Sequence, residues 1–356
     1  MKAIIKRELK NYLKNPILWV GLVIVVFGMF KQLSPYLQIH YFNSDKEIQD
    51  IHVESPQDGE ITDGYIPATP DQQKEMAFEV IRESLVNDLE YSEDKADEII
   101  GNMKDMTVPE ACEYLKKFKY NGAIYTFEDK RYRQGTMEEV NGYLNEKFKE
   151  HSFSFYFSRK FADFAGLFMY FFSTVLFAFL FLRDTKKDTY ELLHTKPVRP
   201  WQYVLGKMGG GFLVALLVLG VLNLIFGTLC MLHAGNAGFP ANVMDMLYAT
   251  CIYVLPNMLM VIAVYTIVAL LFKNPLPAAP LLILYMVYSN MIQRVIGSDG
   301  SERYIGRPLA IMVRFPGQFF DTTPPPFVLL NQTFLILVSA VIIILAITIW
   351  KRRRVY

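Results

Sequence analysis

Six long runs of mainly apolar residues dominate the hydrophobic pattern of this chain. Each run is close to the roughly 20 residues that a helix needs to cross a bilayer. The runs are apolar on all sides, whereas a helix on the surface of a soluble protein has one apolar face. We therefore predict an all-α polytopic membrane protein with six transmembrane helices, at residues 17–37, 161–182, 208–232, 246–272, 276–292 and 327–350.

Short basic segments indicate which ends of these helices face the cytoplasm. Lys and Arg residues cluster in residues 1–16, in residues 183–207 and in the tail 351–356, and Lys273 lies alone between the fourth and fifth spans. These places share one side of the membrane if all six runs cross it. Because short cytoplasmic loops are enriched in basic residues, we predict that both termini are cytoplasmic. No small-x-small cleavage motif follows the first run, so we expect a span there rather than a signal peptide.

The distribution of charge separates one segment from the rest of the chain. The 356 residues carry a formal net charge of +1. Residues 31–158 nevertheless hold 14 Lys and Arg against 26 Asp and Glu, a net charge of −12. We therefore predict a large extracellular domain at residues 38–160, between the first and second spans. An overall balance near zero gives no reason to expect nucleic-acid binding, and three cysteines are too few for a disulfide framework.

Capping residues predict that this extracellular domain is mainly helical. A Ser or Thr before a helix often pairs with Glu or Gln three residues later, and Pro is favoured at the first helical position. The sequence indicates helices from Thr69-Pro70-Asp71-Gln72 to about Leu89, from Ser92 through Met103, from Thr107 to near Phe118, and from Thr136 and Glu139 towards the second span. Weak alternation at residues 37–42 indicates a strand.

Residues 1–16 have the pattern of a cytoplasmic amphipathic helix. Ile5, Leu9, Tyr12 and Leu13 recur at helical spacing, with basic residues on the other face, and Pro16 turns the chain into the bilayer. The alternative is that the basic residues only fix the orientation of the first span.

The cytoplasmic loop at 183–207 contains a second candidate surface. Thr185 and Asp188 can cap a short helix that Pro197 stops. This segment is either a solvated loop or a docking surface, and its large apolar side chains favour docking, because they are costly to leave in water. The docking residues that we expect are Tyr190, Glu191, Leu192 and Leu193.

The outer loop at 293–326 is too long to be a simple turn. Its middle, residues 308–313, is apolar. We expect a short re-entrant or interfacial helix there, because non-helical backbone at membrane depth must be covered by protein or water.

Several kinds of chemistry are missing from the sequence. It contains no GxxxxGK[ST] motif, catalytic dyad, dinucleotide fingerprint or zinc-ligand spacing. Charged residues are rare within the spans, and we expect Asp163 and Asp245 at outer ends, in reach of water. An ion-coupled transporter needs ionisable groups near the midplane. We therefore expect no catalytic site, metal or cofactor in this chain, and an energy source in another protein.

The arrangement of these segments resembles the permeases of type-2 ATP-binding-cassette (ABC-2) exporters. The resemblance covers most of the chain outside residues 31–160. It includes the N-terminal connecting helix, a coupling helix at about residues 186–194, Glu191, Pro197 and Gly206-Lys207 before the third span, and re-entrant helices between the fifth and sixth spans.

This resemblance implies a function and partners. Two permease chains, identical or different, would pair in a bacterial plasma membrane and sit on two separate ABC ATPase subunits, which bind ATP and Mg²⁺. Tyr190, Glu191, Leu192 and Leu193 would contact the ATPase, and the connecting helix would support them. The sequence leaves the exported substrate open. The alternative function is a membrane sensor or scaffold whose acidic outer domain binds a ligand or partner.

Overall fold

The computed structural model describes residues 1–49, 61–179, 198–296 and 302–352. The chain forms two compact units. The first unit contains residues 1–37, 151–293 and 304–356, and the second contains residues 38–150 and 294–303.

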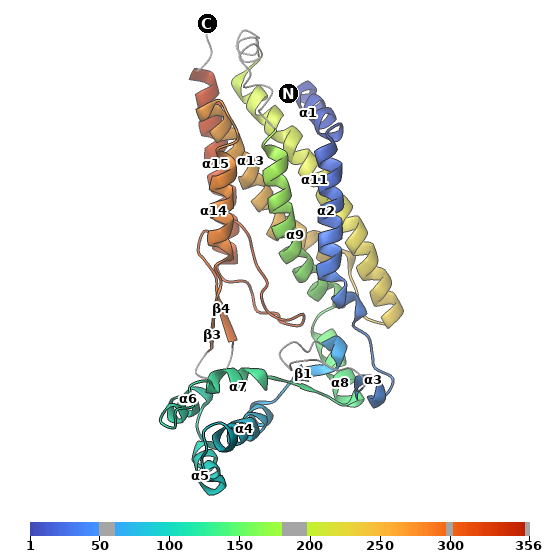
Figure 1. The fold of residues 1–356 in the computed structure, drawn as a ribbon. Helices are drawn as coiled ribbons and strands as arrows, with labels where there is room; N and C mark the ends of the chain where they lie inside the picture. Colours follow the sequence, from blue (N-terminus) through green and yellow to red (C-terminus); the bar gives the residue numbers. More distant parts are fainter. Residues whose placement is uncertain (50–60, 180–197, 297–301, 353–356) are drawn as a thin grey trace. The chain divides into compact units, whose positions relative to one another are not determined.

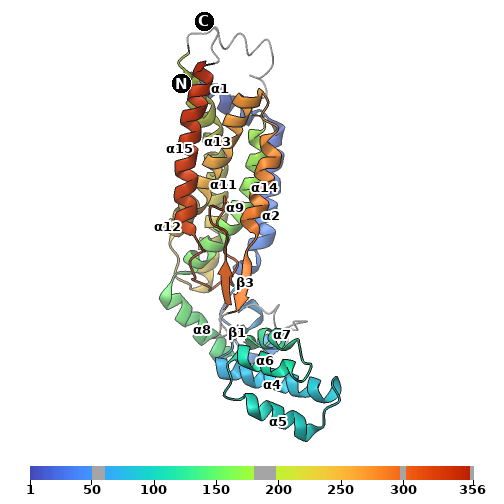
Figure 2. The ribbon, with the colours of Figure 1, turned by 90° about the vertical axis from the view of Figure 1, so that its left-hand side faces the viewer.

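The first unit consists mainly of long apolar helices that run side by side (Figures 1 and 2). Five of the helices described are long and apolar enough to cross a membrane. One of them, Val243–Phe272, consists of α12, a π-helical turn and α13 in succession. The elements are α1 (Lys2–Leu13), α2 (Pro16–Leu33), the 3-10 helix η1 (Pro35–Gln38), α9 (Phe153–Phe177), α11 (Pro200–Ala237), α12 (Val243–Ala249), the π-helix η3 (Thr250–Val254), α13 (Leu255–Phe272), α14 (Ala278–Asn290) and α15 (Val328–Arg352).

The fifth predicted span, at residues 276–292, corresponds to the short apolar helix α14. Its 13 residues are about 20 Å long, less than the ~30 Å of a hydrocarbon core. The helix ends early because the chain continues into strand β3 (Gln293–Ile296), which pairs with β4 (Glu302–Ile305).

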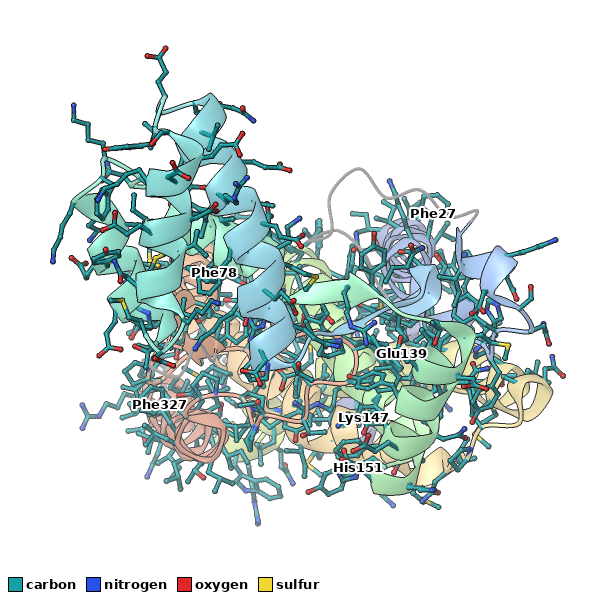
Figure 3. All side chains as sticks on the ribbon, turned by 90° about the horizontal axis from the view of Figure 1, so that it is seen from below. Phe27, Phe78, Glu139, Lys147, His151 and Phe327 are labelled. Carbon is teal, nitrogen blue, oxygen red and sulfur yellow. The ribbon has the colours of Figure 1, made fainter. Side chains whose placement is uncertain are left out.

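Buried helices form the centre of the first unit. α13 contacts α9, α11, α14 and α15, and α2 packs on α9. The outer faces of α2 and α15 remain apolar and exposed, as Phe27 of α2 shows at 70% exposed and Leu329 of α15 at 82%. Phe27 of α2 and Phe327, the residue before α15, are labelled in Figure 3, and both side chains are exposed. Such faces suit contact with lipid or with another membrane helix.

Prolines and polar side chains shape the helix ends and the one break within a span. Asn15 caps α2 through the Ile17 amide at 3.1 Å, and Gly238, in the left-handed region at φ 75°, ends α11. Pro256 cannot donate a backbone hydrogen bond, and the π-helical turn η3 lies directly before it. The Asn257 side-chain amide donates to the Tyr253 carbonyl at 3.0 Å, so a polar side chain bonds the backbone beside this break.

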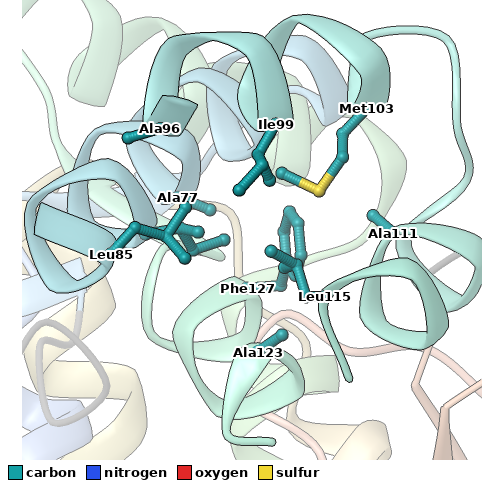
Figure 4. Close-up of a cluster of buried hydrophobic side chains, with 10 residues drawn as sticks. Ala77, Leu85, Ala96, Ile99, Met103, Ala111, Leu115, Ala123 and Phe127 are labelled. Atoms are coloured by element: carbon teal, nitrogen blue, oxygen red, sulfur yellow. The ribbon is translucent and has the colours of Figure 1, made fainter. Parts of the chain in front are cut away.

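The second unit contains short helices around a small apolar core. Its core residues come from α4, α5, α6 and α7, and Figure 4 shows their side chains converging. The elements are α3 (Asp45–Gln49), the 3-10 helix η2 (Ile61–Asp63), β1 (Tyr65–Pro67), α4 (Pro70–Asn87), α5 (Glu93–Met103), α6 (Val108–Lys116), α7 (Ala123–Asp129), β2 (Tyr132–Gln134) and α8 (Met137–Glu150).

The caps predicted at Thr69, Thr107 and Thr136 are present, whereas Ser92 occupies the N-cap position of α5 without a side-chain capping hydrogen bond. Thr69 and Gln72 form a full capping box on α4, and Thr107 and Glu110 form another on α6. On α8, Glu139 accepts from the Thr136 amide at 2.9 Å while its own amide donates to the Thr136 hydroxyl at 3.3 Å. Local sequence therefore positions these helices.

The strand predicted at residues 37–42 is wrong. The chain there forms the end of η1 and then an irregular segment. Ile39 and Phe42 are buried, but they lie three residues apart and not on one face of a strand. The Phe42 backbone instead bonds the Asn141 side chain, at 2.9 Å through its amide and 2.8 Å through its carbonyl. The two paired strands β1 and β2 are three residues each, too short to show a period in the sequence.

Candidate functional site

The N-terminal helix α1 is seated on the first turns of α11. Glycines one helical turn apart make the close approach possible. A Cβ atom at Gly206 would lie 3.0 Å from Ile4 Cβ, and one at Gly210 would lie 2.5 Å from Glu8 Cβ. Side chains at these two positions would push the helices apart, so the glycines of α11 form a seat for α1.

A buried ion pair lies at the centre of this seat. Lys207 Nζ donates to Glu8 Oε1 at 2.9 Å, and the two side chains are only 5% and 8% exposed. Each charge would be strongly destabilising in this position without the other. The pair therefore fixes one register of α1 on α11 and links the N-terminus to the chain that emerges from the 183–207 loop.

The four residues predicted for the connecting helix differ in their surroundings. Tyr12 is 4% exposed, while Ile5 and Leu9 are half-buried. Ile5 Cδ1 lies 3.6 Å from the position of a Cβ at Gly209. Leu13 is 40% exposed, so the packed face of α1 is centred on Glu8 and Tyr12 and does not include Leu13.

Glu8 is a site residue that the sequence analysis missed, because apolar spacing alone placed it among the polar positions. One signal could have found it: Glu8 is the only carboxylate in the first 44 residues, within an otherwise basic segment.

Tyr12 is buried beside Glu8, and the Tyr12 hydroxyl has no hydrogen-bond partner. Burial, and after it the Glu8 carboxylate, raises the pKa of Tyr12 well above its ordinary value.

The predicted docking residues Tyr190, Glu191, Leu192 and Leu193 lie outside the described residues. The next described residue is Val198, which lies two residues before α11 begins at Pro200. Tyr203, one turn into that helix, stacks on Trp350 of α15 with ring centroids 4.0 Å apart and planes at 15°. The start of α11 is thus held by both the N-terminal and the C-terminal helices.

A second polar constellation surrounds the irregular segment 306–327 of the first unit. The re-entrant helix predicted within 293–326 is absent from the described part of this loop, which forms β3, β4 and irregular chain. Ala310, Ile311, Met312 and Val313 are all buried. The short helix expected around residues 308–313 is therefore wrong, because these residues form irregular chain that is packed inside the unit.

Side chains from α14 satisfy the backbone of this segment in place of helical hydrogen bonds. The hydroxyls of Tyr285 and Tyr288 donate to the carbonyls of Leu309, at 2.5 Å, and Pro308, at 2.9 Å. The Ser289 hydroxyl accepts from the Ile311 amide at 2.9 Å. A buried backbone without such partners would be strongly destabilised, which explains why a non-helical chain is tolerated here.

The same segment is anchored by a buried ion pair to α9. Arg314 Nε donates to Asp163 Oδ1 at 2.5 Å, and its Nη1 donates to Asn290 Oδ1. The Asp163 side chain is 5% exposed and also accepts from the Phe315 amide at 3.1 Å. The expectation that Asp163 reaches water is therefore wrong, because α9 begins at Phe153 and the irregular segment covers this carboxylate.

Two further cations of α9 bind carbonyl groups of the segment. The Lys160 ammonium donates to the Phe315 carbonyl at 3.1 Å and to the Gly317 carbonyl. The Arg159 guanidinium donates to the Thr323 carbonyl at 2.6 Å and lies 4.7 Å from the centre of the Phe315 ring. These interactions hold the segment in place, and no arrangement of nucleophile, base and acid is evident among the residues named here.

Within the described ranges, no group of three or more His, Cys, Asp or Glu side chains is placed to hold a metal ion. The two constellations described above are instead suited to mechanical coupling. The α1–α11 seat joins the N-terminus to the base of one span, and the Asp163–Arg314 pair joins another span to the segment before α15.

Comparison with known proteins gives one family match. A family model described as "ABC-2 family transporter protein" matches residues 2–304. The match includes the α1–α11 seat and Asp163, whereas Arg314 and α15 lie beyond its end. No curated protein and no solved structure gives a significant match to the chain.

Proposed function

The chain belongs to the ABC-2 family of transporter proteins, and from this membership we propose that it is the permease subunit of a bacterial exporter driven by a separate ATPase. A family member of this kind is a membrane component of an ABC transporter. The family match over residues 2–304 carries the proposal, and it favours transport over the alternative of a sensor or scaffold.

The proposed division of labour follows from the sequence. The chain contains no GxxxxGK[ST] loop with which to bind the phosphates of ATP. ATP and Mg²⁺ would bind to the partner subunit, and this chain would contribute the membrane path. A second permease chain, identical or related, would complete the path between the two copies.

The proposed route of coupling begins at the cytoplasmic loop. Glu191, Leu192 and Leu193 would dock on the ATPase. Movement of the 183–207 loop would then displace α11, which begins at Pro200. The Glu8–Lys207 ion pair would transmit it to α1, because a buried pair resists separation of the two helices.

The proposed topology has six spans, with α14 as the short fifth span and both termini in the cytoplasm. The basic flanks of the spans support it through the positive-inside rule. In this arrangement the acidic residues 38–160 face the outside of a bacterial plasma membrane. Their net negative charge suits a cationic partner or substrate.

The proposal is tested at the docking residues. The chain is expressed with a candidate ATPase, and Leu192 and Leu193 are both replaced by alanine. If both are buried at the interface, each truncation removes about 1–3 kcal/mol of apolar burial, so co-purification of the ATPase and transport should fall together. The matched control is the Leu329→Ala plus Leu330→Ala pair, whose side chains are 82% and 49% exposed on α15.

The two pairs of substitutions should both insert normally into the membrane. Full ATPase association and full transport by the Leu192→Ala plus Leu193→Ala protein would show that the loop does not dock. ATP hydrolysis by the purified chain alone would contradict the assignment of that step to a partner.

A further inference from the structure

An elongated groove lies along α11, α12 and the π-helical turn η3 of the first unit, away from both constellations described above. Its volume is about 630 Å³, within the range of ligand sites. Its lining is mainly apolar, and it comes from residues 216–232 of α11, residues 243–255 of α12, η3 and α13, and Ser154 of α9.

Glycines of α11 create the hollow. A Cβ atom at Gly220 or at Gly227 would meet nothing within 4 Å. These glycines are seven residues apart and therefore lie on the same face of the helix, with Asn223 between them. The Asn223 amide donates to the Thr250 hydroxyl at 2.9 Å, so these two polar side chains of the lining are bonded to each other.

The dimensions of the groove fit one hydrocarbon chain. At 1.5 Å per residue, the α11 wall from Leu216 to Leu232 is about 24 Å long. The volume divided by this length gives a mean cross-section of roughly 26 Å². One leaflet accounts for about half of a ~30 Å hydrocarbon core, so an acyl chain of about 15 Å would occupy roughly two thirds of the groove length.

The rim of the groove is exposed on the outside of the helices. Leu224 is 70% exposed and Leu232 is 60% exposed, and Leu247 of α12 is 46% exposed. In a membrane this rim would face the lipid, so an acyl chain can enter from the side without any opening of the bundle.

A carboxylate that is bonded to a lining residue lies beside the groove. Asp245 Oδ2 accepts from Ser154 Oγ at 2.6 Å and from Ser152 Oγ at 2.8 Å, and Ser154 lines the groove. Asp245 is half-buried between the lining residues Val243 and Met246. No Lys, Arg or His of the described chain forms an ion pair with it. This negative charge complements a cationic headgroup.

We propose that this groove binds one membrane phospholipid, with an acyl chain along α11 and a primary-amine headgroup, such as that of phosphatidylethanolamine, against Asp245. The apolar lining supplies the affinity and the carboxylate supplies the selectivity. The site is separate from the α1–α11 seat, so its test does not depend on the proposed transport function.

The test measures retained lipid on the full chain. The protein is reconstituted in nanodiscs of equal phosphatidylethanolamine and phosphatidylglycerol and released for native mass spectrometry, at energies that strip loosely held lipid. One phosphatidylethanolamine per chain should remain. Gly227→Leu fills the groove and should reduce retention about tenfold, as expected from displacing two buried methylene groups. Gly220→Leu, also in open space, repeats the test independently.

Gly235→Leu is the matched control. A Cβ at Gly235, on the same helix but outside the groove lining, also meets nothing within 4 Å, so this variant should retain lipid normally. Asp245→Asn should keep a lipid but reduce the preference for phosphatidylethanolamine about two- to fivefold, the effect of one partly exposed charge pair.

Three results would overturn the proposal. The first is a native chain that retains no lipid, and the second is equal retention in Gly227→Leu and Gly235→Leu. The third is a native chain without a headgroup preference, or a preference that Asp245→Asn leaves unchanged. If Gly227→Leu instead converts a dimer into a monomer and leaves lipid retention intact, the groove binds a second copy of the chain and the lipid assignment is wrong.

Discussion

Replacing Glu8 by alanine should release α1 from α11 while the spans still insert. The substitution removes one partner of a buried 2.9 Å ion pair and leaves the Lys207 ammonium, whose side chain is 5% exposed, without its counter-charge. The Cβ atom that packs over Gly210 is retained, so the effect reports the charge rather than the loss of that contact.

Breaking a buried pair by removing one partner typically costs about 3–5 kcal/mol. Lys207 is near the start of α11, and its flexible side chain can move towards water when α1 opens, which favours the lower end of this range. A change of about 3 kcal/mol in the free energy of local opening corresponds to roughly a 100-fold increase in the opened population.

Hydrogen exchange measures this directly. The amides of Lys2–Leu13 in the full chain, in membrane mimetic, should lose about 100-fold in protection in Glu8→Ala, while those of α13 should be unchanged. Lys6→Ala is the control, because Lys6 is an exposed residue of the same helix, and it should change the opening free energy by less than about 0.5 kcal/mol.

A double replacement separates the ion pair from general damage to α1. Glu8→Leu combined with Lys207→Met replaces both charges by apolar groups, and such exchanges are often neutral or stabilising. Protection of α1 should therefore return. The reasoning is refuted if Glu8→Ala protects α1 as well as Lys6→Ala does, or if the double replacement is no better protected than Glu8→Ala.

Three other substitutions test the remaining packing and charge arguments. Gly210→Ala should lower the free energy of opening α1 from α11 by about 1–3 kcal/mol, because its Cβ would be 2.5 Å from Glu8 Cβ. Gly235→Ala is the control, because its Cβ meets open space. Equal hydrogen exchange of α1 in the two variants would contradict this prediction. Asp163→Ala should leave Arg314 without its carboxylate and free the 306–327 segment, so that protease cleaves there sooner than in the native chain; equal cleavage rates would contradict the anchoring role. In the second unit, the Arg133 hydrogen bond, followed by that of the Thr136 amide, lowers the pKa of Glu139 from 4.5 to about 2. The ionised Glu139 therefore stabilises the folded state fully above about pH 4.5, and this stabilisation is lost as the pH falls towards 2. Glu139→Gln keeps the cap and should lower the unfolding free energy by less than about 1 kcal/mol at pH 6 and by nothing near pH 2, measured by urea titration; a difference independent of pH would contradict the ion-pair argument.

The long spans and the helix caps could be predicted from the sequence because their causes are local. A run of about 20 apolar residues is favourable in a membrane whatever surrounds it. A Thr followed three residues later by Gln or Glu satisfies its own helix terminus, as Thr69 with Gln72 and Thr136 with Glu139 do. The arrangement of the spans, though not the helix caps, also carried the resemblance to ABC-2 permeases, and the family match over residues 2–304 confirms it.

The environment of each charged residue was decided only by the tertiary structure. Asp163 was expected to reach water and Glu8 was not singled out, but Arg314 and Lys207, which lie 151 and 199 residues away in the chain, pair with these carboxylates. A pairing over such a separation leaves no periodic signal in the sequence.

The irregular course of residues 306–327 has the same kind of origin. An apolar segment in a membrane is expected to be helical because its backbone must be hydrogen-bonded. Here Tyr285, Tyr288 and Ser289 of a neighbouring helix supply those bonds, so the segment is buried without forming a helix. The sequence by itself determined which parts of this protein are apolar and where its capped helices begin. The tertiary structure alone decided which polar groups those apolar parts enclose, because the partners of a buried polar group come from distant parts of the chain.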